Sequence, residues 1–141
     1  MPLNTPMLRQ PPCELMPASA YTVEALTEAY NQTRVDYIVP MPMNPARLQA
    51  YIDDYGVDLD RSVVARDSEG ILGLAMLGTR PGRTWITRLG VLPVRRRGGT
   101  GGAMMGYLID QSRDLGVDDI ILEVIKDNEP AHQLFLKLGF R

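Results

Sequence analysis

The residues with the clearest chemical potential form a basic, glycine-rich loop over residues 96–102, with the sequence Arg-Arg-Gly-Gly-Thr-Gly-Gly. The loop lies between a predicted strand and a predicted helix, where the first N–H groups of the helix lack acceptors and the helix dipole is positive. Glycines let the backbone approach an anion closely and present several N–H groups to one phosphate. Each glycine within a helix costs about 1 kcal/mol relative to alanine, so several at one helix start favour a function. We therefore expect a pyrophosphate-bearing ligand here, with a plain glycine turn beside solvated arginines as the alternative.

The charges around this loop favour an anionic ligand. No acidic residue occurs from Gly70 to Ile109, while six of the 15 basic residues fall between positions 80 and 97. These six are Arg80, Arg83, Arg88, Arg95, Arg96 and Arg97. The loop lacks the Gly-Lys-Ser/Thr ending of a nucleoside-triphosphate P-loop, and Met104 stands where a dinucleotide fingerprint requires its third glycine.

Periodicity predicts the elements that position this loop. Apolar spacing and caps predict helices over 22–31 and 45–55, with Thr22 and Asn44 as N-caps. Short apolar runs joined by turn residues then predict three antiparallel strands. The glycine loop leads into another predicted helix that ends at Gly116. Beyond it we expect a parallel strand over 119–125, buried on both faces, and a last helix over 131–138.

Composition excludes several classes of protein. A single cysteine, Cys13, excludes a disulfide scaffold, and a single histidine, His132, excludes a multi-histidine metal site, so we expect no metal. No stretch approaches the roughly 20 apolar residues of a membrane span. The net charge of −2 argues against nucleic acid as a general partner. We therefore expect a cytoplasmic protein without a membrane or nucleic-acid partner.

Two ordered motifs resemble the GNAT superfamily, the acyl-CoA-dependent N-acyltransferases. The first is Val91-Leu-Pro93 followed by Arg96-Arg-Gly-Gly99-Thr-Gly101, with Arg95 as a one-position alternative to Arg96. The second comprises Leu122-Glu-Val124, Asn128, Ala131, Phe135 and Leu138-Gly-Phe140. The resemblance covers residues 62–141 well and the two leading helices loosely.

The resemblance implies an α/β fold with a mainly antiparallel sheet, one splayed parallel strand pair and about four flanking helices. It implies transfer of an acetyl group from acetyl-CoA to a primary amine of a small molecule or peptide, by direct attack in a ternary complex. The backbone amide of Leu89 would polarise the acyl carbonyl. The implied coenzyme A contacts are Leu89, Val91, Arg96, Arg97, Gly98, Gly99, Thr100, Gly101, Gly102, Asn128 and Phe135.

The acid and base of the reaction depart from the family pattern. Phe135 stands where many members have a tyrosine that protonates the departing thiolate, and we expect its ring to pack in the core. Water, Tyr37 or Tyr107 are the substitutes. Glu123 is the candidate general base, with a water chain, or a merely structural role for this carboxylate, as alternatives. A non-catalytic acyl-CoA-binding domain is therefore the rival interpretation.

The domain organisation follows from the same comparison. We expect one domain over 1–141: an extended lead-in over 1–13, a first strand and acceptor-side helices over 14–61, and the acyl-CoA-binding core over 62–141. The family's last two strands do not follow Arg141 in this sequence. We therefore expect an open edge on strand 119–125. Either the chain is a fragment with a C-terminally incomplete core, or a second copy or a further domain covers that edge.

Overall fold

The computed structural model describes residues 13–35, 42–95, 98–122 and 129–140, and its centre is one sheet of five strands in the order β1-β2-β3-β4-β5. The strands are β1 (Glu14–Pro17), β2 (Val63–Asp67), β3 (Gly70–Arg80), β4 (Arg83–Val91) and β5 (Asp119–Leu122). Neighbours from β1 to β4 pair antiparallel, whereas β4 and β5 pair parallel. The predicted mixed sheet is therefore confirmed. Its splay would involve residues 123–125, which lie outside the described residues.

Local sequence signals set the helix boundaries. The four α-helices are α1 (Val23–Thr33), α2 (Pro45–Asp54), α3 (Thr100–Leu115) and α4 (Glu129–Lys137), and short 3-10 turns cover Ala18–Ala20 and Pro93–Arg95. The side chain of Thr22 accepts a hydrogen bond from the Ala25 N–H, and that of Asn44 accepts one from the Arg47 N–H. Both predicted N-caps are thus confirmed.

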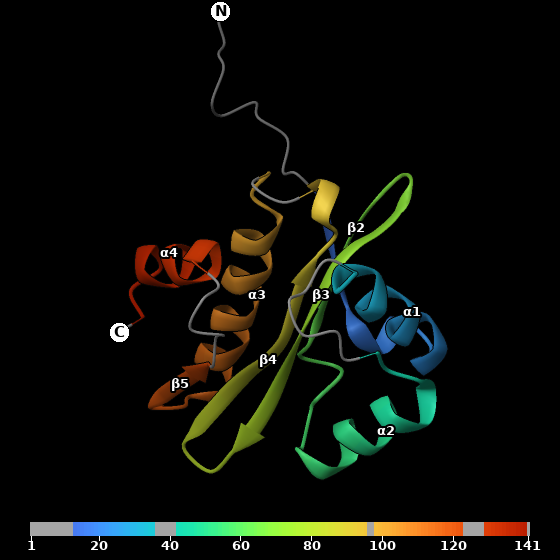
Figure 1. The fold of residues 1–141 in the computed structure, drawn as a ribbon. Coiled ribbons are helices and arrows are strands. Elements are labelled where there is room, and N and C mark those ends of the chain that lie inside the picture. The colour runs from blue at the N-terminus through green and yellow to red at the C-terminus, as the bar shows by residue number, and fades with distance from the viewer. Residues whose placement is uncertain (1–12, 36–41, 96–97, 123–128, 141) are drawn as a thin grey trace, which may run out of the picture.

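Two helical layers enclose the sheet (Figure 1). α1 and α2 lie on one face and α3 and α4 on the other. Each layer has its own apolar core. Leu26, Tyr30 and Leu48 pack against Leu74 and Met76 on the first face. On the second face the core contains Met104, Met105, Leu108 and Phe135, packed against residues such as Leu77 and Ile86.

Two expectations are corrected. β5 is not buried on both faces over its described residues: Ile120 and Leu122 pack against the α3-side core, whereas Ile121 on the other face is 37% exposed. Gly101 and Gly102 do not belong to a loop: they lie in the first turn of α3, which begins at Thr100. Across the described residues, none of the helices combines the length and apolarity that crossing a membrane requires.

Candidate active site

A bulge in β4 marks the centre of the site. Leu74 pairs with Gly90 and Met76 pairs with Thr87, so two residues of β4, Arg88 and Leu89, stand opposite Ala75 alone. Arg88 has a φ of 55°, a left-handed conformation that is uncommon outside glycine. Such bulges bend a strand and redirect its side chains and N–H groups. The bulge therefore interrupts the β3–β4 ladder at Leu89, the residue predicted to polarise the substrate carbonyl.

The start of α3 lies beside the end of β4 and has backbone N–H groups without intrahelical acceptors. The N-cap is Gly99, which has a φ of 90° and offers no side chain as a cap. The first i to i−4 hydrogen bond of the helix runs from the Ala103 N–H to the Gly99 carbonyl, at 3.0 Å. The N–H groups of the residues before Ala103, including Gly101 and Gly102, therefore precede the intrahelical ladder and suit an anion. No acidic residue occupies this first turn.

The two motifs of the sequence meet at this helix start. A Cβ placed on Gly101 would lie 3.4 Å from Leu134 Cδ2 of α4 and 3.9 Å from Val91 Cγ2 of β4. Gly98 and Gly99 are exposed, whereas Thr100 is buried. The fold thus brings together the end of β4, helix α4 and the glycines at the start of α3, as the predicted coenzyme A site requires.

Phe135 lies in the apolar core, as its expected packing role demands. It is 7% exposed, and its ring meets the Phe140 ring edge to face with the centroids 6.3 Å apart. Leu134 and Leu138 pack against the same core. Tyr107 also packs there. The structure does not test Tyr37, Arg96, Arg97, Glu123 and Asn128, because these residues lie outside the described residues.

The opposite face of β4 carries an aromatic and cationic cluster that the sequence reasoning did not find. Tyr30 of α1 and Tyr51 of α2 both lie against Arg88. Arg88 Nη1 donates a hydrogen bond of 2.7 Å to the Tyr30 hydroxyl. The Tyr51 hydroxyl forms a short hydrogen bond with the hydroxyl of Thr87. Both phenols therefore contact the two residues that immediately precede Leu89.

Trp85 extends this cluster along β4. Its indole meets the Tyr55 ring edge to face, with the ring centroids 5.4 Å apart. The ring centroids of Tyr55 and Tyr51 lie 4.6 Å apart. Thr84 and Ile86 point instead to the α3 side, where Thr84 bonds to Ser112 and Ile86 joins the core. The sequence does contain a signal for this aromatic cluster. Tyr51 and its C-cap neighbour Tyr55 are four residues apart, which places both rings on one face at the end of α2. Strand alternation alone could not assign Trp85 to this face.

α1 approaches β4 closely beside the bulge. A Cβ on Gly90 would collide with Oγ1 and Cβ of Thr33, the last residue of α1. Thr33 is 1% exposed, and its hydroxyl donates to the Tyr30 carbonyl at 2.7 Å. Glycine at position 90 therefore lets α1 seat Tyr30 directly over Arg88. Within the described ranges, no group of three or more His, Cys, Asp or Glu residues is arranged to hold a metal ion.

Comparison with known proteins agrees with this geometry. Residues 23–140 match the Acetyltransferase (GNAT) family. Over 80 residues the chain is 35% identical to mycothiol acetyltransferase of Clavibacter michiganensis, a match that covers 56% of this chain and only 26% of that relative. The mycothiol acetyltransferase of Clavibacter sepedonicus matches over the same proportions.

Solved structures share the fold at low sequence identity. The putative acetyltransferase YncA of Salmonella typhimurium, solved with acetyl-CoA, has a TM-score of 0.73 and 19% identity, and the match covers 93% of this chain and 80% of that one. Ard1 of Thermoplasma volcanium has a TM-score of 0.75 and 17% identity, with coverages of 91% and 82%. The ribosomal-protein-S18-alanine N-acetyltransferase of Escherichia coli has a TM-score of 0.69 and 20% identity, with coverages of 91% and 77%.

Proposed function

Because the chain belongs to the acetyltransferase (GNAT) family, we propose that it transfers the acetyl group of acetyl-CoA to a primary amine. One observation carries the proposal: the bulge of β4 at Arg88 and Leu89 lies on the strand that leads to the open, glycine-capped start of α3. The bulge supplies a place for the reacting carbonyl, and the helix start supplies a place for a pyrophosphate.

Coenzyme A would bind along the end of β4. The first-turn amides of α3 would hold its pyrophosphate, and the pantetheine arm would add to β4 as an extra strand beside Leu89 and Val91. Asn128 would donate a hydrogen bond to this arm. The remaining contacts that we propose are Arg96, Arg97, Gly98, Gly99, Thr100, Gly101, Gly102 and, from the core side, Phe135.

The chemistry is a direct displacement at the thioester. The amine nitrogen attacks the acetyl carbon, the carbonyl electrons move to oxygen, and the Leu89 N–H stabilises that oxygen by hydrogen bonding. When the carbonyl re-forms, the C–S bond breaks and its electron pair leaves on sulfur. A thiol pKa near 8.5 makes the thiolate a competent leaving group, so Phe135 at the place of the usual tyrosine is tolerated.

An ammonium acceptor must lose one proton before it attacks, and the nitrogen of the tetrahedral intermediate must lose a second one to become the amide. Glu123 or a water chain would accept these protons, and Tyr37 or water would return one to the thiolate. Tyr51 is an additional phenol for proton transfer, because it is half-buried and its hydroxyl contacts Thr87, two residues before Leu89. Direct attack needs no covalent acyl-enzyme, so catalysis rests on positioning and carbonyl polarisation.

Calorimetry with acetyl-CoA followed by a thiol-release assay tests the proposal. We expect a dissociation constant of about 1–100 µM and acetyl-dependent release of coenzyme A with at least one amine from a panel of amino acids, amino sugars, polyamines and peptide N-termini. Absence of acetyl-CoA binding would refute the site itself.

A non-catalytic acyl-CoA-binding domain is the second candidate, and Phe135 favours it. The buried phenylalanine ring has no proton to supply to a leaving thiolate. This candidate predicts the same affinity for acetyl-CoA as for coenzyme A and no thiol release across the whole amine panel. Transfer to any amine above the hydrolytic background excludes it.

A further inference from the structure

The Arg88 guanidinium lies against the rings of Tyr30 and Tyr51 at the centre of the candidate site. The guanidinium carbon lies 4.1 Å from the centre of the Tyr51 ring and 5.4 Å from that of Tyr30. Nη1 donates to the Tyr30 hydroxyl. The left-handed backbone at the bulge aims this side chain at α1 and α2. An arginine held in this way is preorganised, because stacking fixes its plane before a ligand arrives.

No carboxylate balances this charge among the described residues. Arg61, Arg66, Arg83 and Arg113 each form an ion pair with an aspartate or glutamate, whereas Arg88 forms none. In the same described part of the chain, Arg88 Nε is buried and has no hydrogen-bond partner. A partly desolvated guanidinium without an anion is unfavourable, and an anionic ligand would relieve that penalty.

The surroundings of Arg88 add no negative charge in the described structure. Thr87 is neutral, and Arg34 also stacks on the Tyr30 ring, with its guanidinium carbon 4.6 Å from the ring centre. Asp53 of α2 is exposed and accepts a hydrogen bond from Gln49. Among the described residues, therefore, no carboxylate pairs with Arg88 to attract a purely cationic acceptor.

We propose that Arg88 holds a carboxylate of the acetyl acceptor, so that the acceptor is a carboxylate-bearing amine of the amino-acid type. This inference rests on the proposed function, because it assigns the partner of the same transfer. Arg88 directly precedes Leu89, so a carboxylate held by Arg88 places the amine of a small amino acid near the thioester carbonyl. The planar guanidinium matches the two oxygens of a carboxylate, and the half-buried Tyr51 ring flanks the aliphatic part of the acceptor.

The binding arm of the test uses the sole tryptophan of the chain as a reporter. Trp85 contacts Tyr55, Tyr55 contacts Tyr51, and Tyr51 stacks on Arg88, so we expect a ligand at Arg88 to change the indole fluorescence through this chain of ring contacts. The protein saturated with coenzyme A is titrated with β-alanine, leucine, methionine and glutamate, with each matched carboxamide, and with phosphoethanolamine. We expect at least one free carboxylate to bind about tenfold more tightly than its carboxamide, and phosphoethanolamine to bind no better than the carboxamides.

Substitutions then assign the effect to Arg88. R88Q is expected to weaken binding of the preferred carboxylate about tenfold or more and to leave its carboxamide within about threefold. R88K, which keeps the charge but loses the planar fork, is expected to fall between R88Q and the unmodified chain. R83Q is the matched control, because the Arg83 side chain is 49% exposed and pairs with Asp119 away from the bulge. Circular dichroism and the melting temperature of each variant show that it is folded.

The outcomes separate the two proposals. If the wild-type chain binds the carboxylate more tightly than its carboxamide and R88Q does not, the site is supported. In the thiol-release assay, R88Q should then lower kcat/KM about tenfold for the carboxylate acceptor alone. If R88Q weakens the binding of the carboxylate and of its carboxamide equally, or if phosphoethanolamine binds more tightly than the carboxylates, the carboxylate assignment is overturned. Arg88 is then a structural residue or a phosphate ligand. A carboxylate preference without any acetyl transfer refutes the proposed function while supporting the site. Transfer without a carboxylate preference refutes only this inference.

Discussion

Gly99 shows how a single backbone conformation prepares the coenzyme A site. Its φ of 90° turns the chain from the preceding loop into α3, and no side chain caps the helix. A residue with a Cβ would strain this left-handed position and would cover the amides that follow. The proposed anion site therefore relies on backbone N–H groups, and glycine at position 99 keeps them accessible.

Gly99→Val tests this assignment. The β-branched side chain should destabilise the fold by about 1–2 kcal/mol and weaken acetyl-CoA binding about tenfold or more, because the first turn of α3 must shift. Gly106→Ala is the matched control in the same helix, where an added Cβ meets no atom within 4 Å. It should raise stability by about 0.5–1 kcal/mol and leave the affinity unchanged. Calorimetric titration and urea unfolding give both quantities, and a valine variant that binds normally would disprove the anion site.

At the scale of elements, β4 connects the two halves of the site. Thr84 and Ile86 contact the α3 layer, while Trp85 and Thr87 contact α2 on the other face. The bulge that follows breaks this alternation, which leaves Leu89 packed toward the α3-side core and Arg88 among the tyrosines. One strand thereby serves both the proposed donor side and the proposed acceptor side.

Gly90→Ala should disturb both sides at once. The added methyl group meets the side chain of Thr33, and overpacking of this kind costs about 1–3 kcal/mol. Thr33→Ala in the same chain removes Oγ1 and Cγ2 and should recover part of that loss. Urea unfolding of the two single variants and the double variant measures the coupling. Additive losses would show that α1 does not rest on β4 through this contact.

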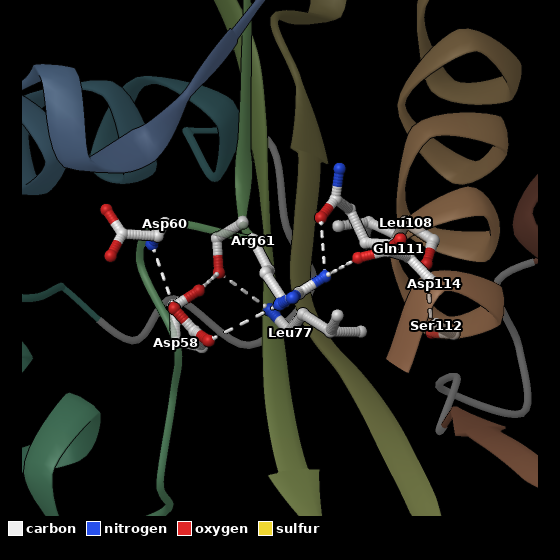
Figure 2. Close-up of polar contacts among 9 residues, drawn as sticks. Asp58, Asp60, Arg61, Leu77, Leu108, Gln111, Ser112 and Asp114 are labelled. Atoms are coloured by element: carbon white, nitrogen blue, oxygen red, sulfur yellow. Dashed lines mark hydrogen bonds and ion pairs between the residues drawn. The ribbon is translucent and has the colours of Figure 1, made fainter. Parts of the chain in front are cut away.

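At the scale of the whole molecule, a polar network ties the loop after α2 to β3 and to α3 (Figure 2). Arg61 Nη1 donates to Gln111 Oε1 at 3.1 Å and to Asp114 Oδ2 at 2.9 Å on α3. The hydroxyl of Ser62 donates to the Asp58 carbonyl and accepts the Leu77 N–H of β3 at 2.9 Å. The network therefore spans the sheet from the α2 side to the α3 side.

Burial should decide which part of this network stabilises the fold. Arg61→Met should lose no more than about 1 kcal/mol, and less in high salt, because Asp114 is 71% exposed and water screens the pair. Ser62→Ala should lose about 1–3 kcal/mol, because Ser62 is 0% exposed and Leu77 would keep a buried N–H without its acceptor. Thermal unfolding at low and high salt compares them. A larger loss for Arg61→Met would contradict this order.

Much of the fold could be predicted from the sequence, because its signals are local. The caps at Thr22 and Asn44, the turns between the strands and the stop at Gly116 all depend on backbone hydrogen bonds within a few residues. The start of α3 was placed too late, because helix propensity counts glycine as unfavourable, whereas packing against α4 accommodates Gly101 in the first turn. The sequence predicts burial of both faces of β5, whereas only one face packs against the core, because an apolar run does not reveal which of its faces is covered.

The sequence by itself determined the family resemblance and the order of helices and strands, and it predicted an anion site at the glycine-rich start of α3, because each depends on residues adjacent in the chain. Only the tertiary structure decided where β4 bulges, and it alone gathered Tyr30, Tyr51, Thr87 and Arg88 from three separate elements. Such a cluster depends on side-chain packing between α1, α2 and β4. No spacing along the chain encodes that packing, so the proposed acceptor site emerged from the fold alone.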